Sequence, residues 1–132
     1  MTGVQTCALP IYYPKDTVGS GIFKSQILGV DVAILNLMGY YTMPMVDNPF
    51  SMVRDEVAEL RDEGYRHIIL DFHAESSAEK NIIFQMLKQE LSAILGTHTH
   101  IGTDDLLLDS GCCYVTDVGD RKSTRLNSSH RL

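Results

Sequence analysis

Three of the five histidines in this sequence have a spacing that could support chemistry. His98 and His100 lie two residues apart in the run 96–100 (GTHTH), and His73 lies upstream in the run 71–75 (DFHAE). In an extended segment, residues at this spacing project to the same side, so both imidazoles could face one cleft. Neutral imidazole is a common ligand of Zn²⁺, Mn²⁺ and Fe²⁺. The pattern predicts a metal site built from His73, His98 and His100, and the alternative for a His-x-His on its own is two solvent-exposed histidines.

Three acidic residues are placed where they could support these ligands. Asp71 and Glu75 lie two residues on either side of His73, and Asp117 ends a later strand near the same edge. A carboxylate commonly accepts the second N–H of a metal-binding imidazole and thereby fixes its orientation. For Glu75, an exposed acid ahead of a helix is an alternative interpretation. His67 lies at the start of its strand, away from this edge, and we expect it at the surface.

A strand–helix–strand unit must position the histidines. Apolar runs at 68–70 and 91–95 are predicted as buried strands of a parallel sheet, and residues 76–90 between them are long enough for one crossover helix. Such a crossover brings the carboxyl ends of both strands to the same edge, where open α/β sheets bind ligands. Neighbouring strands are ~4.8 Å apart, so imidazoles that follow the two strands can converge on one metal centre.

Two predicted elements precede this unit. Strands at 22–28 and 32–37 should form a hairpin with a three-residue connection, and the second strand should lie inside the sheet. A helix should begin at Pro49 with Asn48 as its N-cap and stop at Gly64. The loop between the hairpin and this helix carries residues that could line a substrate pocket or pack beneath the loop: Tyr40, Tyr41, Met43 and Met45.

The remaining elements complete an α/β fold with mostly parallel strands. The crossover helix should begin near Ser76, which is spaced from Glu79 as in a capping box. Strands at 106–108 and 112–116 are predicted as a C-terminal hairpin turned at 109–111. The predicted buried face of the crossover helix consists of Ala78, Ile82, Ile83, Met86 and Leu87.

Composition excludes several classes of protein. The chain has 132 residues, of which 44% are hydrophobic and 21% charged, as in a single globular domain. No apolar run approaches the ~20 residues of a membrane span, and no basic region precedes the short apolar patch near the N-terminus as in a secretory signal. A net charge of −6 without a basic stripe disfavours binding to nucleic-acid phosphates. Cys7 and the adjacent Cys112 and Cys113 form no disulfide framework and receive no catalytic role. We expect a cytoplasmic protein.

The two ends differ in composition from the middle. Residues 1–11 (MTGVQTCALPI) carry no charge, whereas residues 120–132 (DRKSTRLNSSHRL) contain four of the 11 basic residues. Both segments resemble translated sequencing-adapter sequence, so we predict adapter-like, non-native flanks at 1–11 and 120–132 around a body at 12–119. Ordinary terminal tails are the alternative. Neither flank has a periodic apolar face, and we expect neither to pack against the body.

Three motifs in this order resemble the C-terminal half of the YmdB-like metallophosphoesterases, a branch of the calcineurin-like phosphoesterase superfamily: residues 71–75, 96–100 and 114–119 (YVTDVG). Residues 32–39 and 47–50 also fit this family, and the likeness spans residues 13–119. The run GTHTH matches the superfamily motif GHxH with Thr97 in place of the first histidine, a form that is usual in this branch.

The resemblance implies a fragment of a four-layer αββα fold and a hydrolase that cleaves small phosphodiesters such as cyclic nucleotides. It also implies two divalent metal ions, Fe, Mn or Zn, with His73 and His98 binding one and His100 the other. The family's remaining ligands are an Asp, a Glu-Asn pair and an Asn-His pair whose histidine is the proposed general acid. They belong to its N-terminal half and have no counterpart here. We therefore expect a truncated chain that contains no general acid and is inactive alone.

Two other functions compete with the phosphodiesterase. An amidohydrolase also uses a His-x-His at a strand end, but there the motif opens a barrel, and too few residues follow it here. A non-catalytic metal-binding or interaction module remains open as the alternative. Sequence upstream of Tyr12 that contains the remaining ligands would favour the enzyme.

Overall fold

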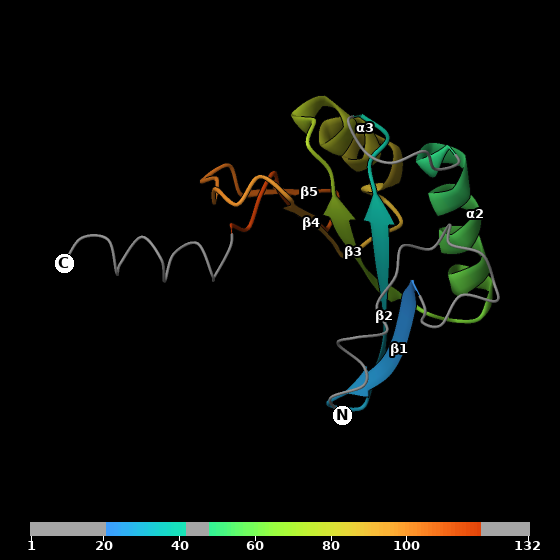
Figure 1. The fold of residues 1–132 in the computed structure, drawn as a ribbon. Coiled ribbons are helices and arrows are strands. Elements are labelled where there is room, and N and C mark those ends of the chain that lie inside the picture. Colours follow the sequence, from blue (N-terminus) through green and yellow to red (C-terminus); the bar gives the residue numbers. More distant parts are fainter. Residues whose placement is uncertain (1–20, 42–47, 120–132) are drawn as a thin grey trace, which may run out of the picture.

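The computed structural model describes residues 21–41 and 48–119, so the predictions for residues 1–20, 42–47 and 120–132, including both flanks, lie outside the described residues. No helix within the described ranges is long and apolar enough to cross a membrane. The elements, in chain order (Figure 1), are strands β1 (Ile22–Ile27) and β2 (Val30–Met38), helix α2 (Pro49–Asp62), strand β3 (His67–His73), helix α3 (Ser77–Leu87), and strands β4 (Ala93–Thr97), β5 (Leu107–Asp109) and β6 (Cys112–Val115).

The described strands form one mixed sheet in the order β1-β2-β3-β4-β6-β5. The four inner strands β2, β3, β4 and β6 are parallel, and the edge strands β1 and β5 pair antiparallel with their neighbours. In Figure 1 the arrows of β2 and β3 point the same way, so their carboxyl ends share one edge. The predicted α/β class, the mostly parallel strands and the C-terminal hairpin are confirmed.

One face of the sheet carries the hydrophobic core. Leu35, Leu70 and Phe72 on this face are fully buried, and they belong to a single cluster that also contains residues of α2 and α3. Both helices therefore lie on the same side of the sheet (Figure 1). On the other face Ile34 and Ile69 stay partly exposed, and no helix of the described chain covers them. The strands that were predicted as buried at 68–70 and 91–95 are thus buried on one face only. One sheet and one helical layer are two of the layers in an αββα fold.

Helix α2 follows its predicted boundaries because its caps are strong. The side chain of Asn48 accepts a hydrogen bond from the backbone N–H of Phe50 at 2.9 Å, and Pro49 occupies the first turn. The helix ends before Gly64, whose φ of 101° lies in the left-handed region that glycine tolerates. Val53 and Val57, which lie one helical turn apart, are fully buried.

Helix α3 buries Ile83 and Leu87 as predicted, and it differs from the prediction in the rest of its buried face. Lys80 and Phe84 are fully buried, whereas Ala78 and Ile82 are exposed. The helix is therefore turned so that residues 80, 83, 84 and 87 face the core. The apolar pattern misplaced this face because it counted the lysine as a surface residue, whereas Lys80 pairs with a buried carboxylate.

Only one of the two hydrogen bonds of a capping box forms at the start of α3. The hydroxyl of Ser76 accepts a hydrogen bond from the backbone N–H of Glu79 at 3.4 Å, as the capping-box pattern predicted. The carboxylate of Glu79 turns instead to the loop after β2, where it accepts hydrogen bonds from the backbone N–H groups of Tyr40 at 2.7 Å and Tyr41 at 2.9 Å. Glu79 therefore connects this helix to the end of β2.

Both hairpins have two-residue turns, which are shorter than the predicted connections. Leu28 and Gly29 turn the first hairpin with φ values of 52° and 80°, and Ser110 and Gly111 turn the second with 55° and 81°. Turns with two positive φ values match the twist of the flanking strands. The residues beside the turns therefore join the ladders, and β5 extends to Asp109, which pairs with Cys112.

Candidate metal centre

The histidines lie where the strand–helix–strand unit was predicted to put them. His73 is the last residue of β3, and in the parallel ladder it pairs with Thr97, the last residue of β4. His98 follows directly, so both imidazoles are at the carboxyl edge of the sheet. His67 lies at the opposite end of β3 and is exposed, as expected.

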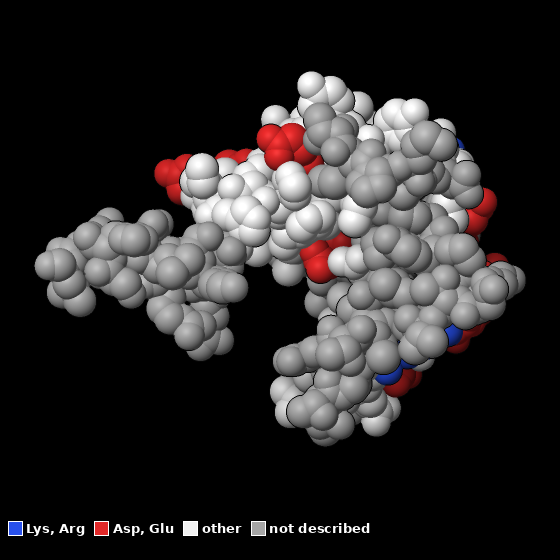
Figure 2. All heavy atoms as spheres, viewed as in Figure 1, with Lys and Arg blue, Asp and Glu red and all other residues white. Residues whose placement is uncertain are grey.

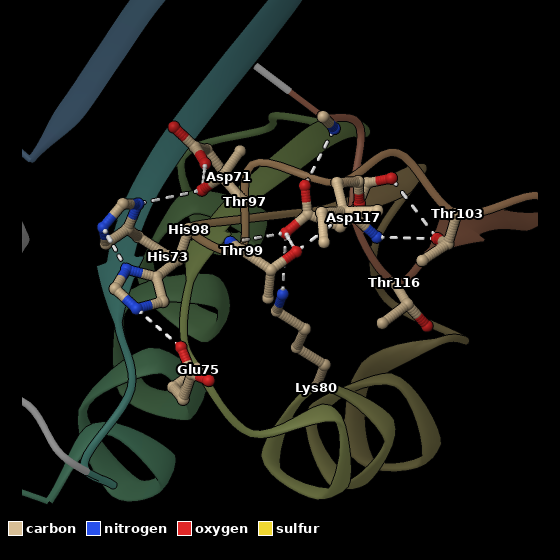
Figure 3. Close-up of polar contacts among 12 residues, drawn as sticks. Asp71, His73, Glu75, Lys80, Thr97, His98, Thr99, Thr103, Thr116 and Asp117 are labelled. Atoms are coloured by element: carbon tan, nitrogen blue, oxygen red, sulfur yellow. Dashed lines mark hydrogen bonds and ion pairs between the residues drawn. The ribbon is translucent and has the colours of Figure 1, made fainter. Parts of the chain in front are cut away.

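The structure brings the imidazoles of His73 and His98 into contact. Their ring centroids are 4.8 Å apart with an interplanar angle of 82°, and His98 Nδ1 is 3.1 Å from His73 Nε2. The ring of His100 is further away, with its centroid 6.4 Å from that of His98. The predicted clustering at one edge is therefore observed, with the first two imidazoles closest together (Figure 3).

Two imidazole nitrogen atoms have a separation that suits two ligands of one divalent cation. Two nitrogen ligands at ~2.1 Å from one tetrahedral ion lie about 3.4 Å apart, close to the separation of His73 Nε2 and His98 Nδ1. In the part of the chain that the structure describes, no group of three or more His, Cys, Asp or Glu side chains is arranged to hold an ion. The described residues thus provide two nitrogen atoms at ligand spacing with a third imidazole beside them, and the metal role of all three histidines remains a prediction.

The backbone of the His-x-His run differs from the extended segment that was assumed. Strand β4 ends at Thr97, and the run continues as a bend in which His98 has a φ of 109° and His100 a φ of 64°. Both values lie in the left-handed region, which residues with a side chain rarely adopt. The alternation of an extended strand therefore does not account for the position of the two imidazoles. Contacts of the loop must hold it in this conformation.

A hydrogen-bonded chain across three strands orients His73. Asp71 accepts hydrogen bonds from Asn36 Nδ2 on β2 and from Thr97 Oγ1 on β4, both at 3.0 Å, and Thr97 Oγ1 lies 3.2 Å from His73 Nδ1. A hydroxyl has one proton, and Thr97 uses it toward the carboxylate, so its oxygen accepts from His73 Nδ1–H. The network therefore assigns the free lone pair of His73 to Nε2, the atom that faces His98.

This network places Asp71 close to its predicted role, with one change. Asp71 was expected to act on an imidazole directly, whereas it acts on His73 through Thr97. Asn36 and Thr97 were not singled out as site residues. Their signal was available, since both occupy positions that the parallel ladders place beside Asp71 and His73.

The protonation of His73 favours metal binding. Burial lowers the pKa of His73, the neighbouring His98 lowers it further, and the opposing effect of Asp71 is smaller. The imidazole is therefore neutral near pH 7, the form in which it can act as a ligand.

Glu75 contacts His98 rather than His73. Its Oε2 lies 2.8 Å from His98 Nε2, a contact that becomes an ion pair when His98 is protonated. Both side chains are partly exposed, which limits the strength of this pair. Since His98 Nδ1 contacts His73 and Nε2 contacts Glu75, an ion bound by His98 would replace one of these two contacts.

Asp117 lies beside the histidine loop and contacts it through Thr99. Its Oδ2 accepts hydrogen bonds from the backbone N–H of Thr99 at 2.9 Å and from the hydroxyl at 2.7 Å, and it pairs with Lys80 Nζ at 3.3 Å. Burial raises the pKa of Asp117, but hydrogen bonds from Thr99 and Gly119, together with the charge of Lys80, outweigh it and lower the pKa overall. Lys80 was not predicted as part of the site.

A shallow hollow lies near the carboxyl end of β2. It has a volume of about 310 Å³ and is lined by Tyr40, Asn48, Pro49 and Phe50. Tyr40 is 63% exposed, so it does not pack beneath the loop. The backbone N–H of Gly39, the preceding residue, donates to the carbonyl of His73 at 2.9 Å, which joins this end of β2 to that of β3. Met43 and Met45 lie outside the described residues.

Known proteins match this chain over most of its length. It is 37% identical over 117 residues to the 2′,3′-cyclic-nucleotide 2′-phosphodiesterase of Bacillus subtilis, an alignment that covers 88% of this chain and 44% of the relative. A solved structure of a hypothetical protein from Thermus thermophilus superposes with a TM-score of 0.76 at 33% identity, covering 83% of this chain and 43% of that one. A structure of a novel phosphatase from Mycoplasma pneumoniae gives a TM-score of 0.73 at 29% identity, with coverages of 83% and 41%. The chain spans less than half the length of each.

The family match agrees with the resemblance stated from the sequence motifs. The model of the family described as YmdB-like protein matches residues 4–124, which include every residue of the site. The match reaches into both segments predicted as flanks, whose origin stays a prediction. The likeness to the phosphatase structure confirms an α/β fold of the metallophosphoesterase type. On this evidence, the chain belongs to the family of YmdB-like proteins.

Proposed function

We propose that this chain provides the histidine side of a divalent-metal site in a phosphodiesterase that hydrolyses small phosphodiesters such as 2′,3′-cyclic nucleotides. The names of the relatives, a cyclic-nucleotide phosphodiesterase and a phosphatase, support phosphoester hydrolysis. The observation that carries the metal site is the 3.1 Å separation of His73 Nε2 and His98 Nδ1 at the carboxyl edge of parallel strands.

The charges around the two imidazoles support a cation at this site. Asp71 and Glu75 are the charged groups in contact with the imidazole network, and the nearby Lys80 is buried against Asp117. Acidic side chains are also spread over the described surface seen in Figure 2, where basic ones are few. A phosphodiester anion would be repelled by such surroundings. A divalent ion would neutralise them and, when bound, supply Lewis-acid activation of the phosphoryl group.

The residues of the chain have distinct parts in this proposal. His73 would bind through Nε2, because Thr97 and Asp71 keep the proton on Nδ1. His98 would share that ion, and His100 would bind the second ion that the family uses. Imidazole ligands suit Zn²⁺, Mn²⁺ or Fe²⁺. Glu75 would orient His98 through its Nε2.

The hollow at the end of β2 is the proposed place for the organic part of the substrate. Tyr40 and Phe50 contribute aromatic rings to its lining, and aromatic rings stack on nucleobases. The backbone hydrogen bond from Gly39 to His73 joins the end of β2, next to this hollow, to the end of β3 that carries His73.

Metal titration tests the proposal directly. Calorimetry with Mn²⁺ and Zn²⁺ should show binding that is lost in His98→Ala and retained in His67→Ala, a matched control at the opposite end of β3. Equal binding by both variants would contradict the site. Binding without hydrolysis, even after the rest of a longer relative is supplied, would favour the non-catalytic metal-binding module over the enzyme.

A further inference from the structure

The loop that carries His98 and His100 needs to be held in place. Both residues have left-handed backbone conformations, with φ values of 109° and 64°, and Thr99 lies between them. Side-chain-bearing residues adopt this region only where the surroundings impose it. Whatever fixes Thr99 therefore also fixes the directions in which the two imidazoles leave the backbone.

Asp117 fixes Thr99 with two hydrogen bonds. Its Oδ2 accepts from the backbone N–H at 2.9 Å and from the hydroxyl at 2.7 Å, and Figure 3 shows dashed contacts from this carboxylate to both Thr99 and Lys80. Its Oδ1 accepts from the backbone N–H of Gly119 at 2.8 Å. The backbone of Asp117 is anchored as well, because its N–H donates a hydrogen bond to Thr103 Oγ1 at 3.0 Å.

Lys80 supplies the charge that allows this carboxylate to be buried. The side chains of Lys80 and Asp117 are 0% and 1% exposed, and Lys80 Nζ lies 3.3 Å from Asp117 Oδ2. A buried carboxylate without a cation is strongly disfavoured. Lys80 projects from α3, the helix that follows His73 in the chain, so the pair connects this helix to the loop of His98 and His100.

We propose that Lys80 and Asp117 are positioning residues, which hold Thr99 so that His98 and His100 are set beside His73 before any ion binds. The orientation of the imidazoles is a property of the free chain, and its use in metal binding rests on the proposed function. A buried ion pair adds little stability compared with apolar side chains of similar size, whereas it fixes geometry well. We therefore expect replacement of the pair to disturb the histidines more than the fold.

Two sets of variants test this role. Thr99→Val removes the hydroxyl and leaves the buried pair intact, and Thr99→Ser restores the hydroxyl. The double variant Lys80→Met/Asp117→Leu replaces the pair with apolar side chains. The control is Lys88→Met/Asp109→Asn, which removes a partly exposed ion pair of 2.7 Å at the other end of α3.

The first measurement is the ¹H–¹⁵N NMR spectrum of the histidine side chains without metal. The signals of His98 and His100 should shift in Thr99→Val and in the Lys80/Asp117 variant, and stay in place in Thr99→Ser and in the control. His67 should not move in any of them. Metal affinity, measured in parallel, should fall about 10–100-fold in the same two variants, as for other residues that orient metal ligands.

The outcomes separate the two proposals. If the unmodified chain binds no ion, the proposed metal site fails, and the NMR signals still decide whether the pair positions the histidines. Unchanged signals of His98 and His100 in folded Thr99→Val and Lys80/Asp117 variants would overturn the positioning role, even if unfolding in urea became easier. If the double variant does not fold, Thr99→Val, compared with Thr99→Ser, gives the decision alone.

Discussion

His73 can offer a lone pair at Nε2 only while its other nitrogen keeps a proton. The hydroxyl of Thr97 secures this, because it donates its own proton to Asp71 and leaves its oxygen to accept from Nδ1. Burial, which lowers the pKa of His73, keeps the ring neutral. At the scale of single residues, a hydroxyl and a carboxylate thus set which nitrogen of the proposed ligand His73 carries the proton.

Thr97→Val should allow the proton of neutral His73 to occupy either ring nitrogen. Without the hydroxyl, Nδ1 loses its acceptor, and part of the population should carry the proton on Nε2 instead. Long-range ¹H–¹⁵N correlation spectra distinguish the two tautomers, and metal affinity should fall about 10-fold or more. Thr97→Ser keeps the hydroxyl and should behave like the unmodified chain. A single unchanged tautomer in Thr97→Val would show that the hydroxyl does not select it.

Cys112 should be unreactive in the folded protein. The side chain is fully buried, and burial, with a smaller effect of Cys113, raises the pKa of Cys112 to about 11. Because the thiolate is the reactive form, only about one molecule in a thousand is reactive there at pH 8. Alkylation by iodoacetamide, located by mass spectrometry, should therefore require unfolding.

The same shift makes stability depend on alkaline pH. The unfolded thiol, with an ordinary pKa near 9, loses its proton before the folded one does. The contribution of Cys112 is fully present below that value and is lost as the pH rises through it toward 11. The urea midpoint should fall over this range, and it should fall less in Cys112→Ala. Equal slopes in the two proteins would contradict the assignment.

At the scale of elements, helix α3 shows how a long-range partner decides which face is buried. Its caps and length follow from local sequence, because Ser76 and the apolar spacing act over a few residues. Its buried face does not, because Lys80 is drawn inward by Asp117, which lies 37 positions later in the chain. An apolar pattern that counts lysine as a surface residue finds Ile83 and Leu87 on the buried face but leaves Lys80 out of it.

The position of the histidines likewise depends on both local sequence and distant contacts. The edge at which they gather followed from the apolar runs and the crossover helix, and β3 and β4 place His73 beside the start of the loop. The left-handed conformations of His98 and His100 could not be predicted, since neither residue is a glycine and the residue between them, Thr99, is held by the distant Asp117. Strand ends are set locally, whereas the conformation of a binding loop is set by what it contacts.

Gly96 is required where β4 meets the segment after β6. A Cβ at this position would lie 1.8 Å from the carbonyl oxygen of Thr116, so the backbone would have to move. Gly96→Ala should therefore destabilise the fold by about 3 kcal/mol or more, as strong overpacking does, measured by urea denaturation. Gly102→Ala is the matched control, since its Cβ would meet nothing closer than 3.7 Å. Similar stability of the two variants would refute the close approach.

At the scale of the whole molecule, the sheet is unequally covered. Both described helices pack on one face, while Ile34, Ile69 and Leu95 on the other remain partly exposed. The chain also spans 44% of the length of its Bacillus relative. An exposed apolar surface of this kind favours association with another protein surface. Among the described residues, the proposed metal ligands are one pair of imidazoles in contact and a third imidazole beside them.

The chain alone should therefore hydrolyse phosphodiesters poorly. We assign none of the described residues as the general acid that protonates the leaving oxygen. A positioned acid alone raises the rate ~10²–10⁴-fold. The assay is turnover of 2′,3′-cyclic AMP and of an aryl phosphodiester with Mn²⁺, with His98→Ala as the background. Turnover as fast as that of the full-length Bacillus relative, and lost in His98→Ala, would show that this chain is sufficient.

The order of the strands also bears on how the molecule is assembled during synthesis. β1, β2, β3 and β4 lie side by side in the order in which they are made, so each can join the sheet as it leaves the ribosome. The last pair is different, because β6 takes its place beside β4 and puts the earlier β5 at the edge. Asp117 follows β6 in the sequence, so the loop of His98 and His100 acquires this anchor only after the six described strands have been made. A nascent chain that ends before Asp117 would thus carry His98 and His100 without the carboxylate that holds Thr99 between them.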